Sequence, residues 1–285
     1  MGSLPVTRAP SRSASRPRAL TIAGSDSGGG AGIQADLKTF SALGVFGMTA
    51  ITAVTVQNTK GVSDVEELSP SVVAEQIRSV AGDIGVDSAK TGMLASAAIV
   101  EAVAGAIEET RLPHLVVDPV FVSKHGHLLL AEDAVGSLKR FILPLATLVT
   151  PNLLEAAGLA GFDVQDRDDM RRAAAAILRL GPRAVLVKGG HLEGDRSIDL
   201  FVEGDLEEWI DAERIDTPHT HGTGCTLSAA ITAHLARGAS LPEAVRAGKV
   251  FVTEAIRHAL SLGDGIGPVD HLWSIPSVRP SYGVR

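Results

Sequence analysis

The chain has 285 residues, 45% of them hydrophobic and 21% charged, with a formal net charge of −7 and one cysteine, Cys225. This charge argues against a broad surface for nucleic acid or anionic membranes, and a lone cysteine excludes an intrachain disulfide and a structural zinc site of several thiolates. Because no apolar run approaches the roughly 18 residues of a membrane helix, we expect a soluble, cytoplasmic enzyme.

Residues 1–18 differ in composition from the rest of the chain, with four arginines, several serines and prolines and no acidic residue. A transit peptide has a similar composition, but this segment is short and lacks a convincing amphipathic pattern. The simpler prediction is a disordered basic tail. No internal repeat or long linker follows it, so we expect one domain over residues 19–285.

Short apolar and β-branched runs alternate with longer stretches rich in alanine and leucine. The runs predict strands at 18–23, 48–56, 88–93, 114–118, 148–150 and 183–188. The stretches predict helices at 31–43, 70–81 with Ser69 as N-cap, 97–109, 168–180, 223–236 and 242–260. Two runs split by Gly204-Asp205, at 197–202 and 207–211, predict a hairpin. Near-continuous apolar strands joined by helices indicate a mostly parallel sheet buried on both faces.

Polar and glycine-rich segments follow the predicted strands, where the loops of a parallel sheet gather around ligands. They are residues 24–32, 57–61, 90–92, 118–130, 151–155, 188–191 and 219–225. Connecting turns are usually polar as well, but charged residues flanked by glycine recur in these segments. We therefore expect one shared cleft.

The first of these segments, Gly24 to Gly32, lies between a strand and a helix and exposes backbone amides at a helix N-terminus. It lacks the Gly-Lys-Ser/Thr ending of a P-loop and the glycine spacing of a dinucleotide-binding fold. The segment is therefore only weak evidence for a phosphate-binding loop. Asp36, a few residues into the helix, is by itself as consistent with a solvated helix position as with a site.

The turn Gly222-Thr223-Gly224-Cys225 opens a predicted helix. Such a turn presents unpaired amides and the positive end of the helix dipole, which together can hold the negative charge of phosphoryl transfer. The same field is expected to lower the pKa of Cys225 and make its thiolate available as a base. The alternative is a buried, inert cysteine, and the flanking glycines favour the functional interpretation.

Oxygen ligands and a lysine follow three other strands. Asn152 and Glu155 share one face of a helical turn and suit Mg²⁺, with Asp118 pointing into the same cleft. Asn152 and Glu155 equally fit a helix cap with its capping-box partner, and spacing does not separate the two. Lys188, followed by two glycines, is a candidate for a nucleotide phosphate, and Lys249 is a weaker one. The spacing of His191, His219 and His221 does not fit a zinc centre.

Taken together, these residues resemble the hydroxymethylpyrimidine/phosphomethylpyrimidine kinases of thiamine biosynthesis, in the ribokinase-like superfamily. The resemblance covers residues 19–273 and rests on the segments 21–26, 29–39, 57–59, 150–152, 188–191 and 221–226. It implies a three-layer α/β/α fold with a mostly parallel central sheet, ATP with Mg²⁺, a small-molecule pyrimidine substrate and a homodimer. The loop 123–127, with His125 and His127, departs from the family pattern.

The resemblance also implies roles for particular residues. It places Gly24, Asp36, Thr55, Gln57 and Val120 around the pyrimidine. Gln57 would read the aminopyrimidine edge, since an amide both donates and accepts hydrogen bonds. The turn from Gly222 to Cys225 would form the anion hole, with Cys225 as base. The nucleotide and metal side would use the residues Asn152, Lys188, Asp118, Lys249 and Glu155, the metal lying at Glu155 and Asp118.

The expected reaction has two transfers from ATP, first to the hydroxymethyl group and then to the resulting monophosphate. The first needs a base more than the second, because a phosphate ester is already ionised. A pyridoxal or pyridoxine kinase shares the implied fold and is the alternative. A non-catalytic sensor of the pyrimidine phosphate is a second alternative, against which the complete turn argues.

Overall fold

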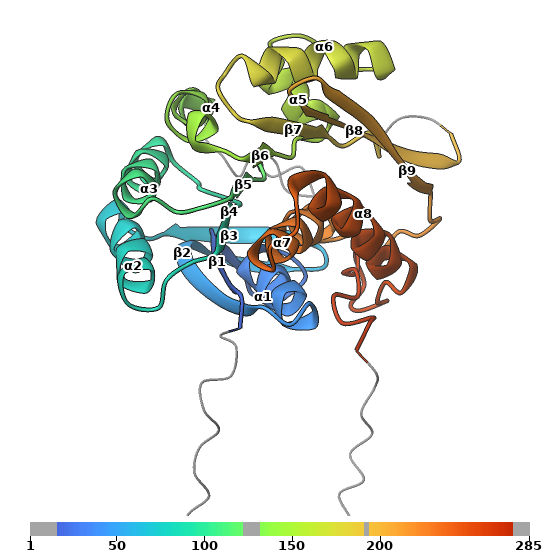
Figure 1. The fold of residues 1–285 in the computed structure, drawn as a ribbon. Coiled ribbons are helices and arrows are strands. Elements are labelled where there is room, and N and C mark those ends of the chain that lie inside the picture. Colours follow the sequence, from blue (N-terminus) through green and yellow to red (C-terminus); the bar gives the residue numbers. More distant parts are fainter. Residues whose placement is uncertain (1–15, 122–131, 191–193, 276–285) are drawn as a thin grey trace, which may run out of the picture.

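In the computed structural model, residues 16–121, 132–190 and 194–275 are described, and one sheet of nine strands runs through them in the order β3-β2-β1-β4-β5-β6-β7-β8-β9 (Figure 1). The strands are β1 (Arg18–Asp26), β2 (Phe46–Asn58), β3 (Gly61–Glu67), β4 (Ser88–Thr91), β5 (Leu115–Val117), β6 (Leu148–Val149), β7 (Ala184–Val187), β8 (Arg196–Glu203) and β9 (Leu206–Glu213). From β2 to β7 neighbouring strands are parallel, and β3, β8 and β9 pair antiparallel at the two edges. The parallel strands therefore bring their carboxyl ends to one edge of the sheet.

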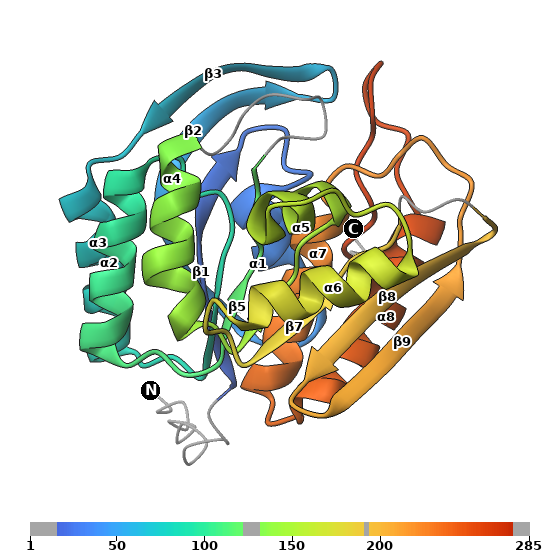
Figure 2. The same ribbon diagram turned by 90° about the horizontal axis from the view of Figure 1, so that it is seen from above.

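Helices cover both faces of this sheet, which gives three layers (Figure 2). One face carries α2 (Pro70–Asp83), α3 (Ala97–Thr110), α4 (Glu132–Ser137), α5 (Leu153–Ala160) and α6 (Arg167–Leu178). The other carries α1 (Gly32–Ala42), α7 (Thr223–Ala236) and α8 (Leu241–Arg257). A π-helical turn (Leu138–Ile142) and a 3₁₀ turn (Leu143–Leu145) extend α4. The predicted α/β/α architecture is confirmed.

Burial on both faces explains why the central strands are almost continuously apolar. Successive side chains of a strand point to opposite faces. Leu115 and Val117 of β5 accordingly join the core under α2 to α6, whereas Val116 between them joins the core under α7 and α8. A strand covered on both faces has no position left for a solvated residue, so apolar and polar residues do not alternate along its sequence.

Most predicted elements are present, and the helix predicted at 223–236 has these bounds in the structure. Strand β3 was missed, because an edge strand pairs on one side only and Val62 is its one buried residue. The short elements α4 and α5 were not separately predicted either. Ser69 is the N-cap of α2, although its side chain makes no capping hydrogen bond.

The basic tail was predicted to extend to Arg18. In the structure Arg18 is instead the first residue of β1 and pairs with Asp87 at 2.6 Å. Residues 1–15, the loop 123–127 and His191 lie outside the described residues, so these predictions stay as they are. Of the helices within the described ranges, none has both the length and the apolar character needed to cross a bilayer.

Candidate active site

The two glycine segments predicted from distant parts of the sequence touch each other. Gly222 is the N-cap of α7 with φ 83°, and a Cβ added there would overlap the carbonyl oxygen of Gly30. A Cβ on Gly30 would in turn overlap the ring of His221. Only glycine permits both the left-handed backbone and this close approach. The loop after β1 and the turn before α7 thus form one wall.

Asp26, at the end of β1, organises this wall. Its carboxylate accepts hydrogen bonds from the backbone amides of Gly28 (2.8 Å), Gly30 (3.0 Å) and Ala31 (2.8 Å) and from His221 Nε2 (2.9 Å). Burial opposes ionisation, but these hydrogen bonds outweigh it and hold the pKa of Asp26 below its usual value. The sequence analysis did not select Asp26 and considered His221 only as a possible metal ligand. The signal available was an Asp two residues before a glycine run, which favours a turn capped by the Asp side chain.

Gln57 reaches the same wall from the end of β2. Its Nε2 lies 3.3 Å from His221 Nε2. Thr55, which is buried, donates to Gln57 Oε1 at 3.1 Å and to the Ser25 carbonyl at 2.9 Å. Gly24 lies nearby, where an added Cβ would come within 3.1 Å of the Met93 sulfur. Three of the five residues expected around the pyrimidine, Gly24, Thr55 and Gln57, therefore lie at this wall.

The other two residues expected around the pyrimidine are Val120 and Asp36. Val120 follows β5 and its amide donates to the Asp118 carbonyl at 2.9 Å. Asp36 is fully buried and bonds to Lys90 Nζ at 2.8 Å and to Thr21 Oγ1 at 2.6 Å. The Asp36 side chain thus has no exposed surface, and its expected contact with the pyrimidine stays a prediction. It points from α1 into the sheet, where burial raises its pKa despite the charge of Lys90.

A lysine held by carboxylates lies against the other end of the glycine turn. Lys188 Nζ is 2.9 Å from Asp118 Oδ1 and 3.9 Å from Glu155 Oε2. A Cβ added to Gly224 would lie 3.5 Å from both Lys188 Nζ and Asp118 Oδ2. The first amides of α7, which have no acceptor within the helix, thus begin beside a partly buried cation. This is an arrangement that can bind phosphate.

Asp118 is the anchor of Lys188. Its carboxylate also accepts from Thr150 Oγ1 at 3.3 Å and from Ser228 Oγ at 3.4 Å. Both oxygens are therefore engaged with protein groups, so the structure does not present Asp118 as a free metal ligand. The charges of Asp118 and Glu155 outweigh burial and raise the pKa of Lys188, which keeps it cationic.

Asn152 and Glu155 form the capping box of α5. Asn152 Oδ1 accepts from the Glu155 amide at 2.9 Å, and Glu155 Oε2 accepts from the Asn152 amide at 2.8 Å. The capping role left open by the sequence is thus observed. Within the described ranges no group of three or more His, Cys, Asp and Glu is arranged to hold a metal. One carboxylate still fits Mg²⁺, since this ion takes few protein ligands when phosphates supply the rest.

Burial raises the pKa of Glu155 to about 7, and the charge of Asp118 adds to this, while Lys188 opposes it. An unfolded Glu ionises near its ordinary value, so between about pH 4.5 and 7 only the unfolded chain releases this proton. We expect this group to lower the free energy of unfolding by about 2–3 kcal/mol as pH rises through that window. Urea unfolding of the metal-free protein at several pH values measures it.

The matched variant for this prediction is Glu155→Gln, because Gln at this position keeps the capping box. Its unfolding free energy should rise relative to the wild type as pH increases from 5 to 8. A constant difference between the two proteins over that range would contradict the pKa assigned to Glu155.

Lys249 does not face the turn, contrary to the expectation for a nucleotide ligand. It is buried, and its Nζ donates to Asp199 Oδ2 at 2.7 Å and to Ser197 Oγ at 3.0 Å. Asp199 Oδ1 in turn accepts from the Gly189 amide at 3.0 Å. Lys249 therefore holds the backbone that follows Lys188.

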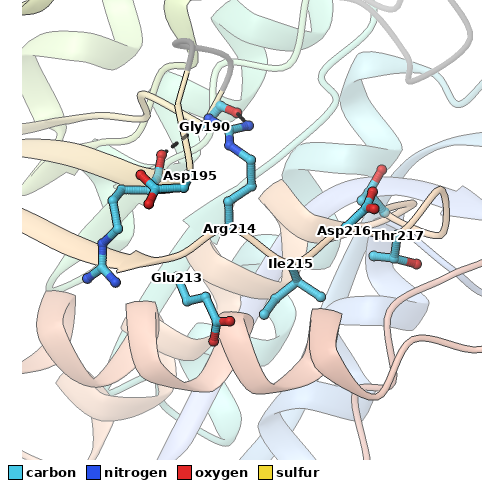
Figure 3. Close-up of a pocket in the computed structure, with 9 residues that line it drawn as sticks. Gly190, Asp195, Glu213, Arg214, Ile215, Asp216 and Thr217 are labelled. Atoms are coloured by element: carbon cyan, nitrogen blue, oxygen red, sulfur yellow. Dashed lines mark hydrogen bonds between the residues drawn. The ribbon is translucent and has the colours of Figure 1, made fainter.

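A cavity of about 830 Å³ opens beside Gly190, two residues after Lys188 (Figure 3). It is lined by Gly190, Asp195, Arg196, Glu213, Arg214, Ile215, Asp216, Thr217 and Thr220. Arg214 Nη1 donates to the Gly190 carbonyl at 2.8 Å, as Figure 3 shows. The cavity thus adjoins Gly190 at one side and the segment leading to the glycine turn, with Thr217 and Thr220, at the other.

The pKa of Cys225 shifts opposite to expectation. Burial raises it to about 12, with further contributions from Asp36 and Asp118, while Lys90 and the Gly32 amide oppose the rise. The field at the start of α7 is therefore outweighed by desolvation. The pKa of Cys225 is therefore raised rather than lowered, and its expected role as the base stays a prediction.

The fold has three layers, and a glycine turn at the start of α7 lies beside a lysine held by carboxylates. Together with the similar solved structures, these features define a kinase of the ribokinase-like class. Within that class, the chain belongs to the phosphomethylpyrimidine kinase family, whose model matches residues 26–270.

Known relatives agree with this assignment. The hydroxymethylpyrimidine/phosphomethylpyrimidine kinase of Streptomyces coelicolor is 56% identical over 94% of this chain and 98% of its own length. The structure of phosphomethylpyrimidine kinase from Clostridium difficile aligns with a TM-score of 0.76 at 45% identity, covering 85% of this chain and 100% of the other. An ADP complex of Bacillus subtilis pyridoxal kinase aligns with a TM-score of 0.85 at 44% identity, covering 90% and 98%.

Proposed function

We propose that the chain uses Mg²⁺ and ATP to phosphorylate 4-amino-5-hydroxymethyl-2-methylpyrimidine, and then its monophosphate to the diphosphate, in thiamine biosynthesis. One observation carries the proposal: a Cβ added to Gly222 would collide with the loop after β1, and a Cβ added to Gly224, two residues on, would contact Lys188 and Asp118. An acceptor at the first contact and a phosphate at the second would meet at one turn. Family membership supplies the pyrimidine as the acceptor.

The acceptor side has the chemistry that an aminopyrimidine requires. Its ring nitrogens accept hydrogen bonds and its amino group donates them, so a side-chain amide can pair with both. Gln57 supplies that amide, oriented by Thr55 and next to His221. Asp26 fixes the glycine loop against which the ring would lie.

The nucleotide is proposed to bind along a path from the cavity to the glycine turn. The nucleoside would lie in the 830 Å³ cavity, and the phosphates would extend past Lys188 towards the amides of Gly224 and Cys225. Glu155 would hold Mg²⁺ together with the phosphates. The metal would supply charge neutralisation of the transferred phosphoryl group; the lysine and the helix amides would orient that group and stabilise the charge it develops.

The Cys225 side chain is expected to contribute less to catalysis than the backbone amides around it. A thiol with a pKa of about 12 must lose its own proton before it can accept another. The loose transition state of phosphoryl transfer demands little deprotonation of the nucleophile. We therefore expect Cys225→Ala, which keeps every backbone amide, to slow the first phosphorylation by less than about 10²-fold and the second by no more than that. Single-turnover rates for each step measure this. A loss of 10²–10⁴ confined to the first step would restore Cys225 as the base.

A coupled ATP assay that resolves mono- and diphosphate products tests the function. The expected result is turnover with the hydroxymethylpyrimidine at a kcat/KM at least tenfold above that for pyridoxal. The likeness to a pyridoxal kinase structure makes pyridoxal the second candidate, and a tenfold preference for pyridoxal would overturn the substrate. Tight pyrimidine binding without ATP turnover would instead indicate a sensor.

We also propose that the protein acts as a cytoplasmic homodimer. Val54 and Val56 are 46% and 58% exposed on one face of β2, which lies next to the edge strand β3. An exposed apolar pair suits contact with a second copy. Sedimentation of the purified protein checks the assembly, and a monomer at micromolar concentration would contradict it.

A further inference from the structure

His221 is a buried side chain that no step of the proposed reaction uses. Its side chain is 8% exposed, and its Nε2 lies 2.9 Å from Asp26 Oδ2 and 3.3 Å from Gln57 Nε2. One ring nitrogen thus faces two side chains, which come from the ends of β1 and β2. A ring nitrogen either carries a hydrogen and donates it or lacks one and accepts. It cannot donate to one neighbour and accept from the other.

Three segments fix the position of the His221 ring. The backbone amide of His221 donates to the Gly267 carbonyl at 3.1 Å, and its carbonyl accepts from the Val269 amide at 3.1 Å. Gly30 lies so close to the ring that an added Cβ would overlap ring atom Cδ2. Because main chain encloses it in this way, the ring is held with Nε2 between Asp26 and Gln57.

Asp26 determines which kind of contact His221 makes. Oδ2 of Asp26 already accepts from the backbone amides of Gly30 at 3.0 Å and Ala31 at 2.8 Å. These donors favour the ionised carboxylate, which has no hydrogen to give to a ring nitrogen. His221 Nε2 must therefore carry a hydrogen and donate it to Asp26. The same nitrogen then has no lone pair with which to accept a hydrogen from Gln57.

Thr55 meets the matching conflict at the other end of the Gln57 amide. Its hydroxyl oxygen lies 2.9 Å from the Ser25 carbonyl and 3.1 Å from Gln57 Oε1. Both neighbours are acceptors, but a hydroxyl has only one hydrogen to donate. The two ends of a side-chain amide are told apart by their partners. With Oε1 towards His221 and Nε2 towards Thr55, every one of these contacts joins a donor to an acceptor.

We propose that His221 is a positioning residue: it holds Oε1 of Gln57, so that Nε2 faces Thr55 and offers its second hydrogen to the substrate. The first Nε2 hydrogen goes to the Thr55 hydroxyl, whose own hydrogen goes to the Ser25 carbonyl. Gln57 is partly exposed, and towards a bound ring it is then a donor. It recognises a ring nitrogen rather than the amino group of the pyrimidine. This inference deepens the proposed function and rests on it, because the ring is that of the proposed substrate.

The orientation can be measured directly in the free wild-type protein by NMR. The chain has four glutamines, so labelling glutamine with a heavy nitrogen isotope gives few side-chain amide signals. Gln57→Met identifies the signal of Gln57 by its loss. The nuclear Overhauser effects of these amide hydrogens should be stronger to the Thr55 methyl group than to the ring hydrogens of His221. The reverse order would overturn the proposal.

Two variants of His221 separate positioning from packing. His221→Met removes the donor, whereas His221→Gln restores one, because a Gln amide nitrogen has two hydrogens for Asp26 and Gln57. His221→Met should raise the KM for the hydroxymethylpyrimidine at least about fivefold, the loss of one hydrogen bond, with a smaller effect on the KM for ATP. In His221→Gln the KM for the pyrimidine should fall at least about threefold below that of His221→Met. Equal rises in both KM values, or no recovery with Gln, would mean that His221 only fills space.

Substrate analogues show which group Gln57 recognises. Gln57→Met should lower kcat/KM at least about fivefold for the hydroxymethylpyrimidine, and by the same factor for the analogue that lacks the amino group. The factor should disappear with one of the two pyridine analogues that carry carbon in place of a ring nitrogen. If it disappears with the analogue lacking the amino group instead, Gln57 accepts from that group and the proposal fails. Failure of the proposed function appears separately, as absence of pyrimidine phosphorylation by the wild type, while the NMR result stands independently of it.

Discussion

A Lys188→Met variant is expected to lose about 10³-fold in kcat/KM for the first phosphorylation, the loss typical of removing a preorganised charge from a transition state. Lys188 is the cation between Asp118 and Glu155 and the side chain that Gly224 approaches. Its loss leaves a buried carboxylate, Asp118, without its ion pair. Unfolding should therefore be easier by about 3 kcal/mol as well.

Activity and stability are measured separately, by initial rates at a temperature where the variant is folded and by urea unfolding. Lys139→Met is the control, since Lys139 donates to the Gly158 carbonyl at an exposed site and should leave both quantities nearly unchanged. A Lys188→Met enzyme that is folded and retains kcat/KM within tenfold of the wild type would contradict the assigned role.

A Gly222→Ala variant is expected to lose at least about 10²-fold in kcat/KM, the effect of a displacement near 1 Å in a reacting geometry. The added Cβ meets the backbone of Gly30, which has no flexible side chain to move aside. The left-handed backbone at φ 83° adds strain for any residue with a Cβ. Together these should lower the free energy of unfolding by about 2–4 kcal/mol.

Gly238→Ala isolates the backbone strain from the collision. Gly238 has φ 88°, and an added Cβ would meet no atom within 4 Å. This variant should cost about 1 kcal/mol of stability and leave kcat/KM unchanged. If Gly222→Ala behaves in the same way, contact between the two glycine segments is not what assembles the site.

The sequence predicted those parts of the fold and site that depend on local spacing. The turn from Gly222 to Cys225 and the helix after it follow from a few adjacent residues. The spacing of Asn152 and Glu155 offered the observed capping box as one of two interpretations. The parallel sheet follows from apolar runs that lack alternation. In each case the evidence lies within one segment, and periodicity or spacing is enough to find it.

The remaining features depend on contacts between distant segments. Asp36 meets Lys90 across 54 residues of sequence, and nothing near either residue indicates the other. Lys249 meets Asp199 across 50 residues. The pKa of Cys225 was predicted from its own helix, but burial by other elements decides it. The predicted site differs from the observed one because segments distant in sequence bury these side chains, and the local sequence does not indicate those contacts.

The contact between Gly30 and Gly222 has a consequence for the order in which the protein is made. The loop after β1 leaves the ribosome early, but its partner lies 192 residues later, and the His221–Pro268 bridge lies later still. Six parallel strands can pair before that partner exists. A nascent chain should thus acquire most of its sheet while it is still unable to bind either substrate, and competence should arrive only with the last quarter of synthesis.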